Sequence, residues 1–321
     1  MAELQQFPHG HLLQFFSAPN QNLVAQYLSL LQARQYSPLT LERIIRTLKA
    51  FCHALPTPRR IVITQDLAQT TAEDIDTWIQ AVQIKGLAPA TIHVALGTLR
   101  QIFAFLIDEG CLIRQPIRRH RHHIILPQHL PRPMAEADIV AFFRVIDAVR
   151  DRLMFLLMLR CGLRVREVQH LTWAVINSEA GSIRIDNAKG QVDRVVYYTP
   201  DVEQALRQYY GLQIGDAPYV FLSHFQRKAG QPISNRLIQH LMTTYCQKAQ
   251  LTTRYSSHSL RHSFATILLN GGASLDVVKE LMGHRSIDMT LRYTQLYDHT
   301  KRQQYDQAMA QLERRQSIGR V

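Results

Sequence analysis

The residues best suited to chemistry lie in the last third of the chain, which reads HSLRHSFAT at 258–266 and MGHRSIDMTLRYT at 282–294. The candidates in these two segments are two histidines, an arginine and a tyrosine, and they are preceded by the first arginine of CGLRVREV and the lysine of AKGQVDR. The candidate set is Arg164, Lys189, His258, Arg261, His284 and Tyr293. Cationic groups neutralise a phosphate and a phenol can attack it, so this set predicts cleavage of a DNA phosphodiester by a tyrosine.

Each step of such a cleavage needs a particular kind of side chain. Arginine suits the nonbridging phosphate oxygens because its planar fork binds two of them and keeps its charge, which makes Arg164 and Arg261 the candidates. His258 and Arg261 are three residues apart, so on a helix they share a face. Arg164 and Glu167 have the same spacing, which lets the carboxylate orient Arg164 or a nearby histidine.

Proton transfer and nucleophilic attack fall to a lysine and a tyrosine. Lys189 is the only lysine of its predicted hairpin and could protonate the leaving 5′-oxygen. Tyr293 follows His284 by nine residues, whereas Tyr297 is a rival only four residues later. A buried core aromatic is the other interpretation of Tyr293, but its spacing and the adjacent Thr294 favour the nucleophile. We expect no metal and no other cofactor, because the cationic side chains take their place.

Composition predicts a polyanionic partner. The 321 residues carry a formal net charge of +12, and the sequence pI is about 9.8. Residues 1–111 hold 8 basic and 8 acidic residues, residues 112–134 hold five arginines and no acid, and residues 135–321 hold 24 basic and 17 acidic residues. The excess charge of +5 and +7 therefore lies in the middle segment and in the C-terminal half.

The first 111 residues predict a small helical domain. Apolar residues at helical spacing mark a first helix at 22–33, and Ser37-Pro38 begins a second one with an N-cap and a proline. Thr71 and Asp74 form a capping box ahead of a third helix. A fourth helix extends over 89–109, where Gly110 ends it.

Residues 112–134 predict a basic linker without a packed amphipathic element, since four prolines, five arginines and four histidines interrupt any apolar pattern. Its charge suits a segment that crosses a nucleic-acid backbone. The DNA-binding candidates are Arg114, Arg118, Arg119 and Arg121, joined by Arg166 in the C-terminal half. A metal site in RRHRHH at 118–123 is the weaker alternative, because metal ligands must be spaced and held by a fold.

Residues 135–321 predict a mixed α+β domain. Helices are expected at 136–147, 150–160, 165–171, 201–210, 235–249, 259–269, 275–282, 287–293 and about 300–315. GSIRIDN and RVVYYT flank AKGQVD and predict a β-hairpin, while LMFLLML at 153–159 is core. The predicted fold is therefore mostly α with a small β-hairpin or sheet, formed by a helical N-terminal domain and an α+β C-terminal domain.

The cysteines and the chain start favour a cytoplasmic protein. Cys52, Cys111, Cys161 and Cys246 lie far apart without a CxxC pair, and three of them fall in or beside apolar helical runs. The start MAELQQFPHGHLL lacks a signal peptide, and the apolar run at 153–159 is too short to span a bilayer. We expect no membrane partner.

Taken together, GLRxxE, a hairpin lysine in KG, HxLRH, GH and a tyrosine nine residues on resemble the tyrosine recombinase/integrase family. The resemblance covers essentially the whole chain, with 1–111 similar to the core-binding domain and 135–321 to the catalytic domain. It is similar to the compact Xer-like or transposon- and plasmid-borne resolving recombinases, since the short stretch before the first helix leaves no room for an arm-binding domain.

The resemblance implies that Arg164, Lys189, His258, Arg261 and His284 surround the phosphate, with Glu167 behind them. Tyr293 would form a 3′-phosphotyrosyl link and free a 5′-hydroxyl, so that rejoining needs no ATP. It also implies double-stranded DNA with inverted-repeat arms as the partner, a homotetramer that exchanges strands through a Holliday junction, and possible accessory proteins. Residues near 300–315 would dock on a neighbouring protomer.

Two other functions fit the same residues. A type IB topoisomerase shares the phosphotyrosine chemistry, but it would relax supercoils without a specific site. A DNA-binding accessory protein that does not cleave would have lost at least one catalytic group, and here all are present. The site-specific recombinase is therefore the leading hypothesis.

Overall fold

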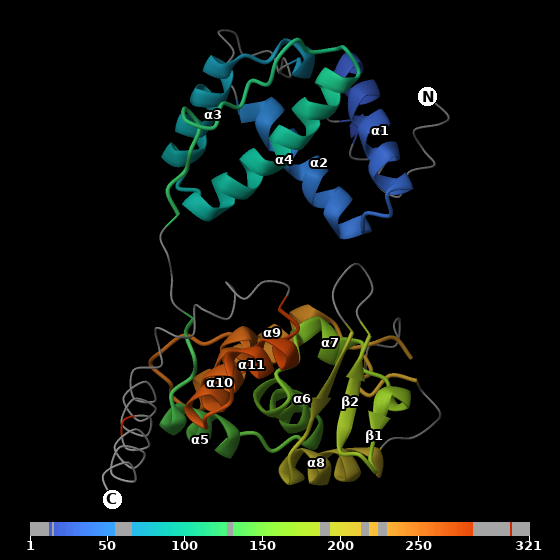
Figure 1. Cartoon of the computed structure of the whole chain (residues 1–321), viewed down its shortest axis with the longest axis vertical. Helices are drawn as coiled ribbons and strands as arrows, with labels where there is room; N and C mark the ends of the chain where they lie inside the picture. The colour runs from blue at the N-terminus through green and yellow to red at the C-terminus, as the bar shows by residue number, and fades with distance from the viewer. Residues whose placement is uncertain are drawn as a thin grey trace, which may run out of the picture. The chain divides into compact units, whose positions relative to one another are not determined.

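The chain divides into two compact units, Met1–Gln128 and His129–Val321. The computed structural model describes residues 13–14, 16–54, 66–126, 131–186, 193–212, 218–223, 230–284 and 309. The division falls inside the segment 112–134 that the sequence predicts to be a linker. Each unit has its own hydrophobic core, shown in Figure 1 by the helices that enclose it.

The described residues of the first unit form the four predicted α-helices, α1 (Ala18–Ala33), α2 (Pro38–Ala54), α3 (Ala72–Ile84) and α4 (Pro89–Asp108), with a 3₁₀ turn at Leu67–Gln69. The predicted starts are confirmed. The Ser37 side chain accepts from the Thr40 amide at 3.3 Å, and Thr71 and Asp74 form the full capping box of α3. After α4, Gly110 has a φ of +70°, a left-handed conformation that favours glycine.

Aromatic side chains of α2, α3 and α4 fill the centre of this unit. The Phe51 ring lies 5.9 Å from Trp78 and 6.0 Å from Phe103, both edge-on. Helix α4 is long and apolar enough to cross a membrane by length and composition. Its buried side chains, among them Leu99 and Ile102, pack into this core, so we interpret α4 as the core helix of the unit.

Within the described residues, 112–126 form no helix or strand, as predicted, but single side chains of this segment are buried in the first unit. Ile117 is buried in the core of the first unit. The His122 side chain is fully buried, accepts from the Arg118 amide through Nδ1 at 2.9 Å, and places Nε2 3.1 Å from an Asp76 carboxylate oxygen. Buried histidine and isoleucine side chains fix the path of the chain here despite its prolines and arginines.

The second unit combines helices with a small sheet. Its helices are α5 (Glu136–Arg144), α6 (Val149–Arg160), α7 (Val165–Gln169), α8 (Pro200–Tyr210), α9 (Asn235–Lys248), α10 (Ser257–Asn270) and α11 (Leu275–Met282). The strands are β1 (Ile176–Asn177), β2 (Ser182–Ile185) and β3 (Arg194–Tyr197), antiparallel in the order β1-β2-β3. The predicted hairpin is thus present, and β1, which follows a 3₁₀ turn at Trp173–Val175, is an addition. The helices predicted at 287–293 and 300–315 lie outside the described residues, apart from Met309.

Helix α6 is the centre of this unit and explains its uniformly apolar sequence. All residues from Leu153 to Leu159 are buried, and the helix packs against α8 and α10 (Figure 1). A helix surrounded by other elements needs no polar face. The chain then turns at Gly162, whose φ is +62° and whose added Cβ would lie 2.4 Å from the Phe264 ring of α10. Only glycine fits this turn, which brings the start of α7 against α10.

The cysteines are free, in line with the sequence. Cys52, Cys161 and Cys246 are buried and Cys111 is exposed. Burial raises the pKa of the Cys52 thiol to about 12 and that of Cys246 to about 11. The buried thiols are therefore protonated core residues rather than nucleophiles.

Candidate active site

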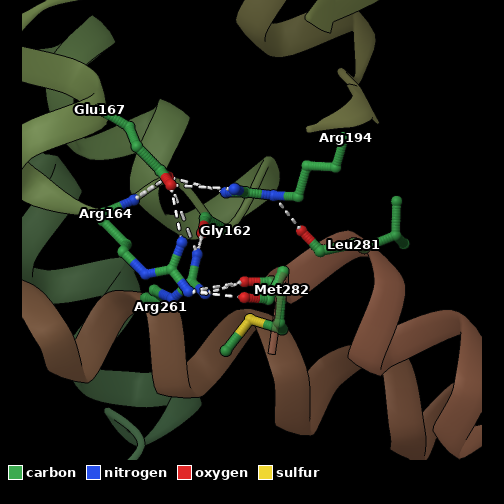
Figure 2. Close-up of polar contacts among 8 residues, drawn as sticks. Gly162, Arg164, Glu167, Arg194, Arg261, Leu281 and Met282 are labelled. Atoms are coloured by element: carbon green, nitrogen blue, oxygen red, sulfur yellow. Dashed lines mark hydrogen bonds and ion pairs between the residues drawn. The ribbon is translucent and has the colours of Figure 1, made fainter. Parts of the chain in front are cut away.

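Two of the predicted arginines meet at one carboxylate. Arg164 precedes the first residue of α7 and Glu167 lies in the first turn, so the Glu167 carboxylate accepts from the Arg164 amide at 2.7 Å and from its Nη1 at 2.8 Å. Arg261 comes from α10, and its Nη1 lies 4.0 Å from a Glu167 oxygen. The three-residue spacing therefore brings Arg164 and Glu167 together, as the sequence predicts, and Arg261 from the second helix, α10, joins them (Figure 2).

The same arginines hold the C-terminal end of α11. Arg164 Nη2 donates to the carbonyls of Met282 at 3.2 Å and Gly283 at 2.8 Å. Arg261 donates to the carbonyls of Met282 and Gly162. Carbonyl oxygens at a helix C-terminus carry a partial negative charge and have no partner within the helix, so guanidinium groups stabilise them. His284 directly follows this end, at the edge of the arginine cluster.

The side chains differ in how far they reach the surface. The Arg164 side chain is 24% exposed, whereas that of Arg261 is 6% exposed. His258, in the first turn of α10, is exposed, and His284 is half-buried. The cluster thus has an accessible side formed by Arg164 and the two histidines, with Arg261 and Glu167 behind it.

Both histidines are neutral near pH 7. The His258 residue as a whole is exposed, but its imidazole is partly desolvated, and this together with the charges of Arg261 and Arg164 lowers its pKa. The same causes lower the pKa of His284 to about 4. Neutral imidazoles can donate a hydrogen bond to a phosphate oxygen or exchange a proton with it, and an arriving anion would raise the pKa of both. His262, which follows Arg261 in α10, is also half-buried, and burial, His258 and Arg261 lower its pKa to about 4.

These histidines predict a loss of stability in mild acid. A histidine whose pKa is lower in the folded state takes up its proton first in the unfolded state, so stability falls as pH drops from about 6.5 towards 4. Allowing for partial exposure, we expect a loss on the order of 2 kcal/mol between pH 7 and pH 5, measured by urea unfolding. His262→Gln should reduce this loss, whereas His240→Gln, at an exposed position, should not. Equal stability at the two pH values would contradict the assignment.

Arg194 belongs to this cluster and was missed by the sequence analysis. It begins β3, donates from Nη1 and Nη2 to the two Glu167 oxygens at 2.9 and 2.7 Å, and donates from Nε to the Leu281 carbonyl at 2.8 Å. A signal for it was present in the sequence. Side chains alternate along a strand, so Arg194 shares the inward face with Val196. An arginine on the apolar face of a strand is a candidate for a buried ion pair.

The remaining predicted site residues differ in whether the structure describes them and in how exposed they are. Lys189 and Tyr293 lie outside the described residues, so their positions relative to the cluster are still predictions. Arg114, Arg118, Arg119 and Arg166 are exposed, as a DNA contact requires. Arg121 binds Asp76 at 2.5 Å and Glu73 at 3.2 Å, which offsets part of its charge. Within the described residues, no group of three histidine, cysteine or acidic side chains is placed so that it could hold a metal ion, at 118–123 or elsewhere.

Comparison with known protein families gives two matches that together cover most of the chain. Residues 112–300 match the Phage integrase family, and residues 24–110 match the family described as Phage integrase, N-terminal SAM-like domain. The boundary between the two matches falls at the start of the predicted linker. Both units of the structure therefore correspond to recognised domains.

Two proteins with similar sequences are tyrosine recombinases. The chain is 30% identical to tyrosine recombinase XerA of Pyrococcus furiosus, over 70% of this chain and 77% of that protein. It is 30% identical to tyrosine recombinase XerC of Lacticaseibacillus casei, over 81% of this chain and 89% of that protein.

Solved structures share the fold. The Tn1549 transposon integrase in complex with transposon right end DNA has a TM-score of 0.69 at 19% identity, covering 88% of this chain and 99% of that one. A lambda integrase tetramer bound to a Holliday junction has a TM-score of 0.66 at 17% identity, covering 84% and 78%.

Proposed function

Because the chain belongs to the phage integrase family of tyrosine recombinases, which break and rejoin DNA, we propose that Arg164 and Arg261 hold the scissile phosphate while Tyr293 attacks it. The convergence of these two arginines from α7 and α10 on one carboxylate carries the proposal. Arg164, Arg194 and Arg261 meet at the single carboxylate of Glu167, so the cluster keeps an excess positive charge that a phosphodiester can balance at the partly exposed Arg164.

The reaction conserves the energy of the phosphodiester bond in a new ester. The Tyr293 hydroxyl releases its proton to solvent as its oxygen attacks phosphorus, the bond to the 5′-oxygen breaks, and the leaving oxygen takes a proton from Lys189. A 3′-phosphotyrosyl ester and a free 5′-hydroxyl result. Attack by another 5′-hydroxyl on this ester reverses the step and restores the tyrosine, so no nucleotide cofactor is consumed. Arg164 and Arg261 stabilise the charge on the nonbridging oxygens, and His258 and His284 donate hydrogen bonds beside them.

The experiment that tests this function is covalent trapping. A duplex built from inverted repeats beside the gene, nicked next to the scissile phosphate, loses its short 5′-hydroxyl fragment after cleavage, so the ester accumulates. We expect a protein–DNA adduct that survives denaturation, absent with a duplex of scrambled arms. Specific binding without any adduct would contradict cleavage and favour a DNA-binding accessory protein. Adducts formed equally on scrambled arms, with relaxation of supercoils, would favour a topoisomerase.

The assembly is proposed from the relatives. A lambda integrase tetramer binds a Holliday junction, and we propose that four copies of this chain likewise join two sites, one protomer on each inverted arm, with residues near 300–315 docking on a neighbour. The mass of the complex on a synthetic four-way junction tests this. Four protomers per junction are expected, and a single bound protomer would contradict the proposal.

The basic segment after α4 is proposed to bind the DNA backbone. Arg118 and Arg119 are exposed neighbours there, so Arg118→Ala/Arg119→Ala should weaken binding to all sequences and make the slope of log K against log salt shallower by about 2, one per lost phosphate contact. Arg121→Ala should change the slope less, because Glu73 and Asp76 already offset its charge. An unchanged slope in the double variant would exclude these two arginines from the interface.

A further inference from the structure

Arg194 is the most deeply buried guanidinium of the cluster. Its side chain is 2% exposed, against 24% for Arg164, although both donate to the same carboxylate. It is also more enclosed than Arg261, at 6%, and its Nε, Nη1 and Nη2 all donate to protein oxygens. Its function must therefore be exerted on its protein neighbours.

The first of these neighbours is Glu167. Arg194 donates to both oxygens of the carboxylate, at 2.9 and 2.7 Å, whereas Arg164 reaches one of them with Nη1 and Arg261 lies at 4.0 Å. The bidentate pair with Arg194 gives Glu167 a partner that has no phosphate to bind. Three guanidiniums and one carboxylate leave a net charge of +2, which remains available to a phosphodiester at Arg164 and Arg261.

The second neighbour is the end of α11. Arg194 Nε donates to the Leu281 carbonyl at 2.8 Å, beside the Met282 and Gly283 carbonyls that Arg164 holds. Gly283 ends the helix with a φ of +59°, and an added Cβ there would lie 3.0 Å from Arg194 Nη1. The turn that carries His284 is thus packed directly on the Arg194 guanidinium.

Arg194 also belongs to the hairpin formed by β2 and β3. Arg194 is the first residue of β3 and pairs with Ile185 of β2. The segment that joins these two strands contains Lys189, five positions before Arg194 in the sequence. The strand end that supports the predicted general acid is therefore fixed to the residues that are predicted to bind the phosphate.

We infer that Arg194 is a positioning residue, which neutralises Glu167 and fixes the end of α11 so that Arg164 and His284 face the scissile phosphate. This inference rests on the proposed function. Figure 2 shows the arrangement, with Arg194 approaching Glu167 from the side opposite Arg164. Without Arg194, the Glu167 carboxylate would pair more closely with Arg164 and Arg261, and the Leu281 carbonyl would lose the hydrogen bond from Arg194 Nε.

The ionisation of Glu167 agrees with this geometry. Burial alone would raise the pKa of the carboxyl, but the hydrogen bond and charge of Arg194, the Arg164 amide and the charge of Arg261 together outweigh burial and lower the pKa to about 2. Loss of Arg194 therefore raises the pKa of Glu167. The acid side of the cleavage pH profile should then move to higher pH, an effect that a merely structural residue would not produce.

The test compares single-turnover cleavage of the nicked duplex by wild type, Arg194→Gln, Arg194→Lys and the control Arg184→Gln. Arg184 lies on the neighbouring strand β2, where its side chain is 65% exposed and pairs with Asp186. We expect Arg194→Gln to slow cleavage on the order of a hundredfold, because a small misplacement of catalytic groups has that effect. DNA affinity should stay nearly unchanged, Arg194→Lys should recover part of the rate, and Arg184→Gln should cleave normally.

A double variant separates positioning from loss of folding. In the Glu167→Gln background, Arg194→Gln should slow cleavage much less than it does in the wild type, since the charge on which it acts is gone. Thermal unfolding identifies the variants that are folded. If Arg194→Gln does not fold, Arg194→Lys takes its place in the test. Normal cleavage by Arg194→Gln, or equal effects of Arg194→Gln in both backgrounds, would overturn the inference alone. A wild type that forms no adduct would overturn the proposed function and this role with it.

Discussion

Tyr293→Phe is expected to abolish covalent attachment to DNA and to leave DNA affinity within about twofold, because it removes one hydroxyl and no charge. Without the phenol oxygen, no ester to phosphorus can form, whatever the arginines contribute. The measurement is denaturing electrophoresis of the trapped adduct on the nicked duplex, with binding measured in parallel by gel shift.

The matched control is Tyr297→Phe, which changes the rival tyrosine four positions later. It should still form the adduct at a rate close to that of the wild type. Adducts retained by the Tyr293 variant and lost by the Tyr297 variant would move the nucleophile to Tyr297. Adducts retained by both would exclude tyrosine attack at either position.

Local sequence patterns predict the parts of the site that local structure determines. Arg164 and Glu167 are three residues apart at the start of a helix, so backbone geometry alone brings them together. The capping box at Thr71 and the proline start at Pro38 are likewise local, and both are confirmed. Such features need no knowledge of how the elements pack.

Contacts between distant elements could not be predicted in the same way. Arg194 and Glu167 are 27 residues apart, and the arginine contacts the end of α11 another 87 residues later. The packing of Ile117 and His122 on the first unit was missed for a similar reason, since prolines and arginines hide the few residues that anchor the segment. Composition describes the charge of a segment, whereas burial depends on its partners.

Arg261→Ala is expected to slow cleavage on the order of a hundredfold or more, by loss of one preorganised donor to the phosphate in the transition state. The Arg261 side chain is 6% exposed and also donates to the Met282 and Gly162 carbonyls. Truncation therefore leaves two buried acceptors without this donor and should lower the free energy of unfolding by about 1–3 kcal/mol. Single-turnover cleavage and urea unfolding together measure the two effects.

The loss of stability must be separated from the loss of chemistry. Arg261→Lys keeps the charge but lacks the planar fork that donates from two nitrogens to a phosphate or to both carbonyls, so its cleavage should also be slow although its net charge is that of the wild type. Arg207→Ala, on α8 with its side chain 78% exposed and paired with Glu203, is the control that removes an arginine away from the cluster, and it should cleave normally. If Arg261→Ala cleaves at a near-normal rate while folded, Arg261 does not stabilise the phosphate, and Arg164 alone would have to balance its charge.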